Sequence, residues 1–337
     1  MAQNGLYSTE DTAELIRQGR TLLLAGDEIL LTQLPEGNWI GGTTASFMTE
    51  DGGVTDKEHI FVTDLSDVAE KAVLSRYKIT EIPHIARDYP RSGFTVLIVP
   101  GGSEIHASFA KGVPFYEDVF ASPLLGWVSG VEISEMETRR PMVFAGRASP
   151  LLNEAVALHV SLPKGKLAHL QTINLFSPSD GDVIVFQQDG FVCDDQCRID
   201  GKLENFASYL TAQHIDPTRP LMASHNGALV NVSIRSIDAD LATVQFYAPV
   251  FAGVEYRFAN PIENYTKTFE QYMELEQYIQ NAGACVIAFS CNCLLNYLSA
   301  NLEGKKTGPF VGPMTYGEIA YILLNQTLVY LKVSDSV

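Results

Sequence analysis

The chain has 337 residues, of which 46% are hydrophobic and 19% are charged, and these values are typical of globular proteins and argue against intrinsic disorder. Its formal net charge of −17 disfavours nucleic-acid and membrane-surface binding, because so acidic a surface repels phosphates and anionic headgroups. The length favours two domains. We expect the protein in the cytoplasm, because the sequence shows no secretory signal and no apolar run long enough to span a membrane, and because its five cysteines are an odd number.

The N-terminal part predicts alternating helices and strands. A helix is expected after Ser8, because Ser8 and Asp11 have capping-box spacing and Leu15 begins an apolar stripe. Residues 94–99 form a continuous run rich in β-branched side chains, which predicts a strand buried on both faces. The other elements expected here are helices over 27–34, 67–77 and 104–111 and a strand over 58–63.

The middle third, residues 127–258, is rich in strand patterns and predicts an antiparallel meander. Asp189-Gly190 and Asn226-Gly227 are dipeptides typical of hairpin turns. Strands are expected at 127–133, 142–144, 155–162, 167–176, 183–187, 220–223, 229–234, 242–247 and 254–258.

The C-terminal part returns to alternation, with helices expected over 269–279 and 292–300 and strands over 285–289 and 327–333. Residues 41–44 and 312–315 are both Gly-x-x-Thr turns, which indicates an internal duplication. The fold class is therefore expected to be α+β, with two related sheet-containing halves and helices on their outer faces. The expected halves are residues 1–150 and 151–337.

Two C-terminal stretches are candidates for chemistry. Cys291 and Asn292 are expected where a buried strand meets a helix, and a helix N-terminus there would lower the pKa of a reactive thiol. The alternative is that Cys291 and Cys293 are small buried hydrophobic residues. Glu318 is a lone acid in an uncharged run, so it needs a partner or a ligand if it is buried. Replacing Glu318 by Gln should then weaken ligand binding by about 1.5–3 kcal/mol.

Two glycine turns nearer the N-terminus are weaker candidates. The turn at Gly101, Gly102 and Ser103 precedes a helix, where backbone N–H groups bind anions, although a tight structural turn explains it as well. We expect the 41–44 turn to meet Thr315 and Glu318 at one cavity that also reaches Cys291. The complete set of candidate ligand-binding residues is Gly41, Gly42, Thr43, Thr44, Gly101, Gly102, Ser103, Cys291, Asn292, Thr315, Gly317 and Glu318.

The C-terminal motifs resemble those of FIST domains, which are bacterial sensory modules that bind small ligands. Ser290-Cys291-Asn292 is similar to the Ser-Cys-x-x-Arg strand end of that family, and residues 312–319 are similar to its Gly-x-x-Thr-x-Gly-Glu-Ile turn. Residues 40–44 are similar to the Gly-x-Thr-Thr turn of its N-terminal half. The arginine of the pattern is missing, since residues 293–295 are Cys-Leu-Leu.

The resemblance implies a stand-alone module that binds an amino acid or a small acid and signals through a separate protein. The alternatives are an enzyme with Cys291 as nucleophile, and a structural or oligomeric scaffold that binds no ligand. No zinc-ligand spacing is present and no histidine lies in the matched turns, so neither a metal nor haem is expected as a cofactor.

Overall fold

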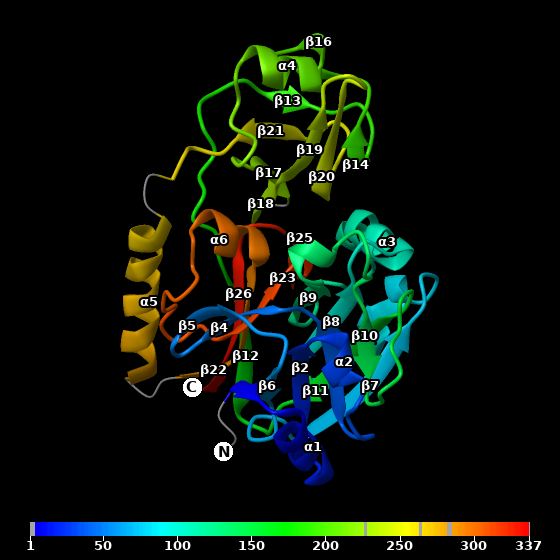
Figure 1. Cartoon of the computed structure of the whole chain (residues 1–337), viewed down its shortest axis with the longest axis vertical. Coiled ribbons are helices and arrows are strands. Elements are labelled where there is room, and N and C mark those ends of the chain that lie inside the picture. Colours follow the sequence, from blue (N-terminus) through cyan, green and yellow to red (C-terminus); the bar gives the residue numbers. More distant parts are fainter. Residues whose placement is uncertain (1–3, 226–227, 263–264, 282–284, 337) are drawn as a thin grey trace. The chain divides into compact units, whose positions relative to one another are not determined.

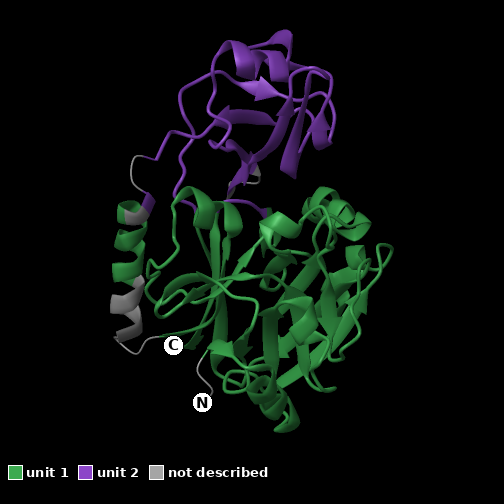
Figure 2. Cartoon of the chain, viewed as in Figure 1, with its two compact units in different colours: residues 1–173, 266–323, 327–337 green, residues 174–265, 324–326 purple. Residues whose placement is uncertain are grey.

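The computed structural model describes residues 4–225, 228–262, 265–281 and 285–336 (Figure 1). Strands account for 43% of the chain and helices for 18%, and the predicted α+β class is confirmed. Two compact units divide the chain (Figure 2): unit 1 comprises Met1–Ile173, Thr266–Leu323 and Thr327–Val337, and unit 2 comprises Asn174–Tyr265 and Leu324–Gln326. These units do not coincide with the expected halves 1–150 and 151–337. That these two halves are related by an internal duplication stays a prediction.

The first module of unit 1 combines two helices with strands that belong to two different sheets. Its elements are β1 (Gly5–Tyr7), α1 (Thr9–Arg17), β2 (Leu22–Gly26), α2 (Glu28–Leu31), β3 (Trp39–Thr43), β4 (Ser46–Thr49), β5 (Gly52–Thr55) and β6 (Ile60–Asp64). The predicted cap is confirmed, because the Ser8 side chain accepts a hydrogen bond from Asp11 N at 3.1 Å. The strand β2 pairs parallel with β3 on one side and antiparallel with β6 on the other.

The second module follows directly. Its elements are β7 (Lys71–Tyr77), the 3-10 helix η1 (Ile82–Asp88), β8 (Gly93–Pro100), α3 (Glu104–Gly112), the 3-10 helix η2 (Val113–Phe115), β9 (Leu124–Ser129), the 3-10 helix η3 (Ile133–Glu135), β10 (Val143–Ala145) and β11 (Ala155–Ser161). The buried run predicted over 94–99 is β8, which pairs parallel with β9 and antiparallel with β11.

The third module is interrupted by unit 2. Its elements are β12 (Lys166–Ile173), α5 (Tyr265–Asn281), β22 (Cys285–Cys293), α6 (Leu294–Ser299), β23 (Gly312–Thr315), β24 (Gly317–Ala320), β25 (Ile322–Leu324) and β26 (Leu328–Asp335). The strand β22 pairs parallel with β23 and antiparallel with β26. The helix α5 lies along the outside of this sheet (Figure 1), where Phe269 contacts Phe310.

The three modules share one strand order, which is β1-β6-β2-β3 in the first, β7-β11-β8-β9 in the second and β12-β26-β22-β23 in the third. The strand after each parallel pair joins another module in a cycle: β4 pairs with β23, β24 with β9, and β10 with β3. The two turns matched in the sequence, 41–44 and 312–315, fall on equivalent strands, and β9 provides a third copy.

Because of this cycle, the carboxyl ends of β3, β9 and β23 meet at one centre of unit 1. Thr44 Oγ1 donates to Met314 O at 2.7 Å. Tyr316 N donates to the carbonyl oxygen of Val128 at 3.1 Å, and Gly130 N donates to that of Thr43 at 2.8 Å.

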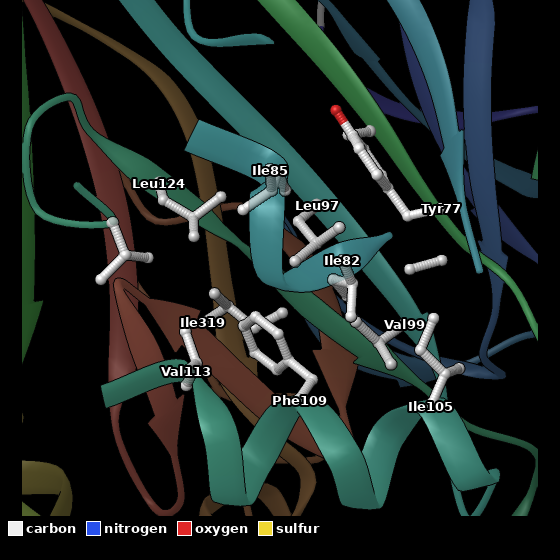
Figure 3. Close-up of a cluster of buried hydrophobic side chains, with 13 residues drawn as sticks. Tyr77, Ile82, Ile85, Leu97, Val99, Ile105, Phe109, Val113, Leu124 and Ile319 are labelled. Atoms are coloured by element: carbon white, nitrogen blue, oxygen red, sulfur yellow. The ribbon is translucent and has the colours of Figure 1, made fainter. Parts of the chain in front are cut away.

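A buried apolar cluster packs α3 against β8 within the second module (Figure 3). Ile105 and Phe109 point from α3 toward Leu97 and Val99 of β8, and all four side chains are fully buried. Ile319 of β24 joins the same cluster, so the third module is packed to the second by apolar contact as well as by strand pairing.

Unit 2 is built from antiparallel strands around an aromatic core. Its elements are β13 (Ile184–Val185), β14 (Gly190–Cys193), β15 (Gln196–Ile199), β16 (Lys202–Asn205), α4 (Phe206–Ala212), β17 (Leu221–His225), β18 (Ala228–Val232), β19 (Ile234–Asp238), β20 (Thr243–Val250) and β21 (Glu255–Phe258). Phe186 makes edge contacts with Phe206, Phe246 and Tyr256. Every strand pair described in this unit is antiparallel, as expected for this part of the chain. The expected antiparallel meander does not extend back to residue 127, because β9 pairs parallel with β8 in unit 1.

Two local predictions are wrong. The helix expected over 67–77 is instead the strand β7, because residues 71–77 pair along their whole length with β11. The hairpin expected at Asp189-Gly190 does not form, since β13 pairs with β15 and β21 while β14 pairs with β20. Asn226-Gly227 lies outside the described residues, between the paired strands β17 and β18. In the described part of the chain, no helix has the length and apolar character needed to span a bilayer.

Candidate functional site

The predicted N-terminal turn is packed into the centre of unit 1. A Cβ atom on Gly42 would lie 2.8 Å from Ile98 Cγ2 and 3.0 Å from Trp127 Nε1, so close packing explains the glycine. Gly41 lies beside it in β3 and is buried too. The neighbouring hydroxyl groups are engaged within the protein, since Thr43 Oγ1 accepts a hydrogen bond from Met142 N at 2.9 Å and Thr44 Oγ1 donates to Met314 O.

The second glycine turn has local partners. Ser103 is the N-cap of α3, accepting from His106 N at 3.2 Å and donating to Pro100 O at 2.6 Å. Gly102 has φ +70° and donates its N–H to His106 Nδ1 at 3.2 Å, while Gly101 N donates to Ser129 O at 3.2 Å. These bonds account for the turn as the start of a helix.

Cys291 is fully buried within β22, because the strand continues to Cys293 rather than ending before it. Its Sγ donates to Gly126 O at 3.5 Å. The expected lowering of its pKa is wrong: burial raises the pKa of Cys291 well above its usual value, and the nearby Glu318 adds to the effect. A cysteine nucleophile reacts as the thiolate, which this environment disfavours.

Glu318 is fully buried, and neighbouring side chains and backbone fill its hydrogen-bonding positions. Thr315 Oγ1 lies 3.0 Å from Oε1, and Thr327 offers its N–H at 3.2 Å and its hydroxyl at 2.9 Å to Oε2. The Cys293 thiol makes a further hydrogen bond to the carboxyl group. Burial raises the pKa of Glu318 to about 8 despite these bonds, so the group is protonated at neutral pH.

The two turns are in contact, as expected, through the bond from Thr44 to Met314, while the cavity expected between them stays a prediction. Glu318 pairs opposite Trp127 in the adjacent strand, and its carboxyl group, when ionised, raises the pKa of Cys291. Asn292 and Gly317 complete this cluster, with their carbonyl oxygens 3.3 and 3.2 Å from Thr315 Oγ1. Thr315, Gly317, Glu318 and Asn292 thus form a buried hydrogen-bonded cluster, whereas the bonds of Gly101, Gly102 and Ser103 connect them to the start of α3 and to Ser129.

An open hollow of about 570 Å³ lies elsewhere in unit 1, at the carboxyl end of β2. Asp27 follows β2, caps α2 and accepts a hydrogen bond from Ile29 N at 2.9 Å. The residues that line the hollow are Asp27, Glu28, Ile29, Thr32, Lys57, Glu135 and Arg139. Sequence reasoning missed this set because Asp27 and Arg139 are far apart in the chain, and the only related signal was that the helix expected over 27–34 begins at Asp27.

Ion pairs organise the hollow. Arg139 binds Asp27 through both terminal nitrogens, at 2.7 and 3.0 Å, and also binds Glu135 Oε2 at 2.9 Å. Lys57 Nζ contacts Glu135 Oε1 at 2.7 Å and Glu132 Oε2 at 3.2 Å. The Arg139 side chain is 23% exposed and that of Lys57 35%, so both cations are accessible to solvent.

The pKa values follow these contacts. Burial alone would raise the pKa of Asp27, but the hydrogen bonds from Arg139 and Ile29 outweigh it and hold that pKa below its usual value. The hydrogen bonds from Lys57 and Arg139 lower the pKa of Glu135, and the bond to Glu135 raises that of Lys57. The hollow therefore presents fixed charges of both signs at neutral pH, which suits a polar or charged small molecule.

A comparison with curated proteins gave no match. Residues 7–334 match DUF6976, a family of unknown function. The match covers nearly the whole chain, including both units, and the chain therefore belongs to the DUF6976 family.

Proposed function

We propose that the chain is a small-ligand-binding sensory module of FIST type, that it works in the cytoplasm through a separate signalling partner, and that its ligand is an amino acid or a small acid. We place the ligand in the charged hollow rather than at the buried Glu318. The observation that carries this proposal is the exposure of Lys57 and Arg139 beside Asp27 and Glu28 in an open hollow.

The chemistry of the hollow supports that ligand class. The guanidinium group of Arg139 and the ammonium group of Lys57 match a carboxylate, because charge-assisted hydrogen bonds to carboxylates are the strong ones. Asp27 and Glu28 match an amine, and Thr32 adds a hydroxyl group. The position also fits, since ligands of open α/β sheets bind beyond the carboxyl ends of parallel strands.

Cys291 and Glu318 support the proposal less. A ligand that reached either would have to displace groups that are fully buried and already hydrogen-bonded within the protein. The free cysteines, all five of which lack a disulfide, are consistent with a reducing compartment.

The test is a thermal-shift screen of amino acids and small mono- and dicarboxylic acids, followed by calorimetry on any hit. A ligand at one hundred times its Kd stabilises the folded state by about 2.7 kcal/mol, which a thermal shift detects. Lys57→Gln should weaken binding about tenfold, as expected for the loss of one charge-assisted contact. Lys111→Gln, on the exposed last turn of α3, is the matched control and should bind as the wild type does.

Two results would contradict the proposal. The first is that no compound of these classes stabilises the protein. The second is a ligand that binds Lys57→Gln as tightly as it binds the wild type and the Lys111→Gln control.

A further inference from the structure

A short segment between β9 and β10 closes one side of the hollow. This strap, residues 132–139, contains η3, and its backbone N–H groups bond within the strap itself. Glu135 N donates to the carbonyl oxygen of Glu132 at 2.9 Å, and Arg139 N donates to that of Glu135 at 2.9 Å. Side-chain ion pairs tie the strap to the rest of unit 1, through Lys57 and Asp27.

Glu135 occupies the position that a bound carboxylate would take. One of its oxygens lies 2.7 Å from Lys57 Nζ and the other 2.9 Å from Arg139 Nη1, so a single carboxylate bridges both cations of the hollow. The Glu135 side chain is 26% exposed, so water reaches its ion pairs and weakens them. A free anion can compete with contacts weakened in this way.

The charge balance points the same way. With the strap in place, the cations Lys57 and Arg139 face the carboxylates of Glu132 and Glu135 as well as those of Asp27 and Glu28. When the two strap carboxylates move away, two cations face two carboxylates, so an added monocarboxylate leaves one negative charge in excess, compared with two when the strap is in place.

We infer that Glu135 is an internal competitor for the ligand, that the ligand is a small carboxylate, and that its binding displaces Glu135 and releases the strap from Lys57, while Arg139 stays paired with Asp27. This inference rests on the proposed ligand site in the hollow. It also supplies a signal, because a strap released from Lys57 presents a changed surface to a partner. A purely cationic ligand would pair with the carboxylates and leave the bridge intact.

The test compares the wild type with Glu135→Gln, which keeps the shape of the side chain and removes its charge. Glu154→Gln is the matched control, since Glu154 forms a similarly accessible ion pair with Arg76 on β7, outside the hollow. Acetate and succinate are the probes. Each protein is measured by calorimetry and by amide hydrogen exchange over residues 132–139.

Glu135→Gln should bind whichever probe the wild type binds about threefold to fivefold more tightly, and its strap should exchange faster before any probe is added. In the wild type the probe itself should speed exchange of the strap, while Glu154→Gln should match the wild type throughout. If the wild type binds a probe but Glu135→Gln binds no more tightly, or if the probe slows exchange of the strap, displacement is contradicted while the site stands. If neither protein binds either probe or any other small acid, the proposed site itself is contradicted along with the inference.

Discussion

Glu318→Gln is the substitution whose outcome the geometry determines most sharply. In its protonated form, Glu318 can donate a hydrogen bond from Oε1 to Thr315 Oγ1, 3.0 Å away. The Thr315 hydroxyl group then donates to the carbonyl oxygen of Gly317, at 3.2 Å, or of Asn292, at 3.3 Å. Oε2 accepts both hydrogen bonds from Thr327. A glutamine amide reproduces this pattern, with its NH₂ group toward Thr315 and its oxygen toward Thr327.

The expected effect depends on pH. Burial raises the pKa of Glu318 from 4.5 to about 8, so the folded protein holds this proton more tightly than the unfolded chain does. The stabilisation is complete below pH 4.5 and is lost as pH rises to 8, by on the order of 5 kcal/mol. Glutamine does not titrate, so the variant should gain stability relative to the wild type over that interval.

Urea denaturation at several pH values between 5 and 9 measures the difference. Near pH 5 the two proteins should agree to within about 1 kcal/mol, and at pH 8 and above the variant should be several kcal/mol more stable. Glu154→Gln, at a partly exposed ion pair, controls for the chemistry of the substitution and should stay within about 1 kcal/mol of the wild type. A Glu318→Gln variant that is less stable than the wild type by a constant amount at every pH would refute the reasoning.

Three further predictions concern packing, acid stability and thiol reactivity. Gly42→Ala should destabilise the protein by about 1–3 kcal/mol in thermal or urea unfolding, because its Cβ atom would overlap Ile98. Gly5→Ala is the control, since a Cβ atom there meets open space. An effect of Gly42→Ala as small as that of Gly5→Ala would contradict the close packing. His159 is buried between Tyr77 and Thr95, and burial lowers its pKa to about 4. The neutral side chain should therefore contribute about 3 kcal/mol of stability above pH 6.5, and this contribution is lost as pH falls to 4. His159→Gln should remove this dependence of the unfolding free energy on pH, and an unchanged dependence would contradict the prediction. Cys291 should resist iodoacetamide in the folded protein at pH 8 and react after unfolding. Fast labelling of Cys291 in the folded protein, located by mass spectrometry, would contradict this and support the alternative of a cysteine nucleophile.

The sequence correctly predicted those helices and strands that are determined by residues close together in the chain. The cap at Ser8 and the buried run that became β8 need only neighbouring residues, and both were predicted correctly. The strand β7 was mistaken for a helix because its partner β11 begins about 80 residues later, and that pairing decides its conformation.

The candidate site shows the same limit. The lone acid at Glu318 was recognised, but the Thr327 groups that satisfy it are placed only by the return of β26 to the sheet. Arg139 and Asp27 are brought together by the pairing of β10 with β3, which no local pattern indicates. The matched glycine turns did predict a real meeting point, yet the centre they form is packed, and the hollow lies at the end of β2 instead.

Methyl NMR of isoleucine-labelled protein tests the location of the ligand most directly. Ile29 lines the hollow and its side chain is 66% exposed, whereas Ile319 is fully buried next to Glu318. Addition of a small acid or amino acid that binds should shift the Ile29 methyl signal and leave that of Ile319 in place. A ligand that shifts Ile319 while Ile29 stays unchanged would contradict the account and place binding at the buried carboxyl cluster.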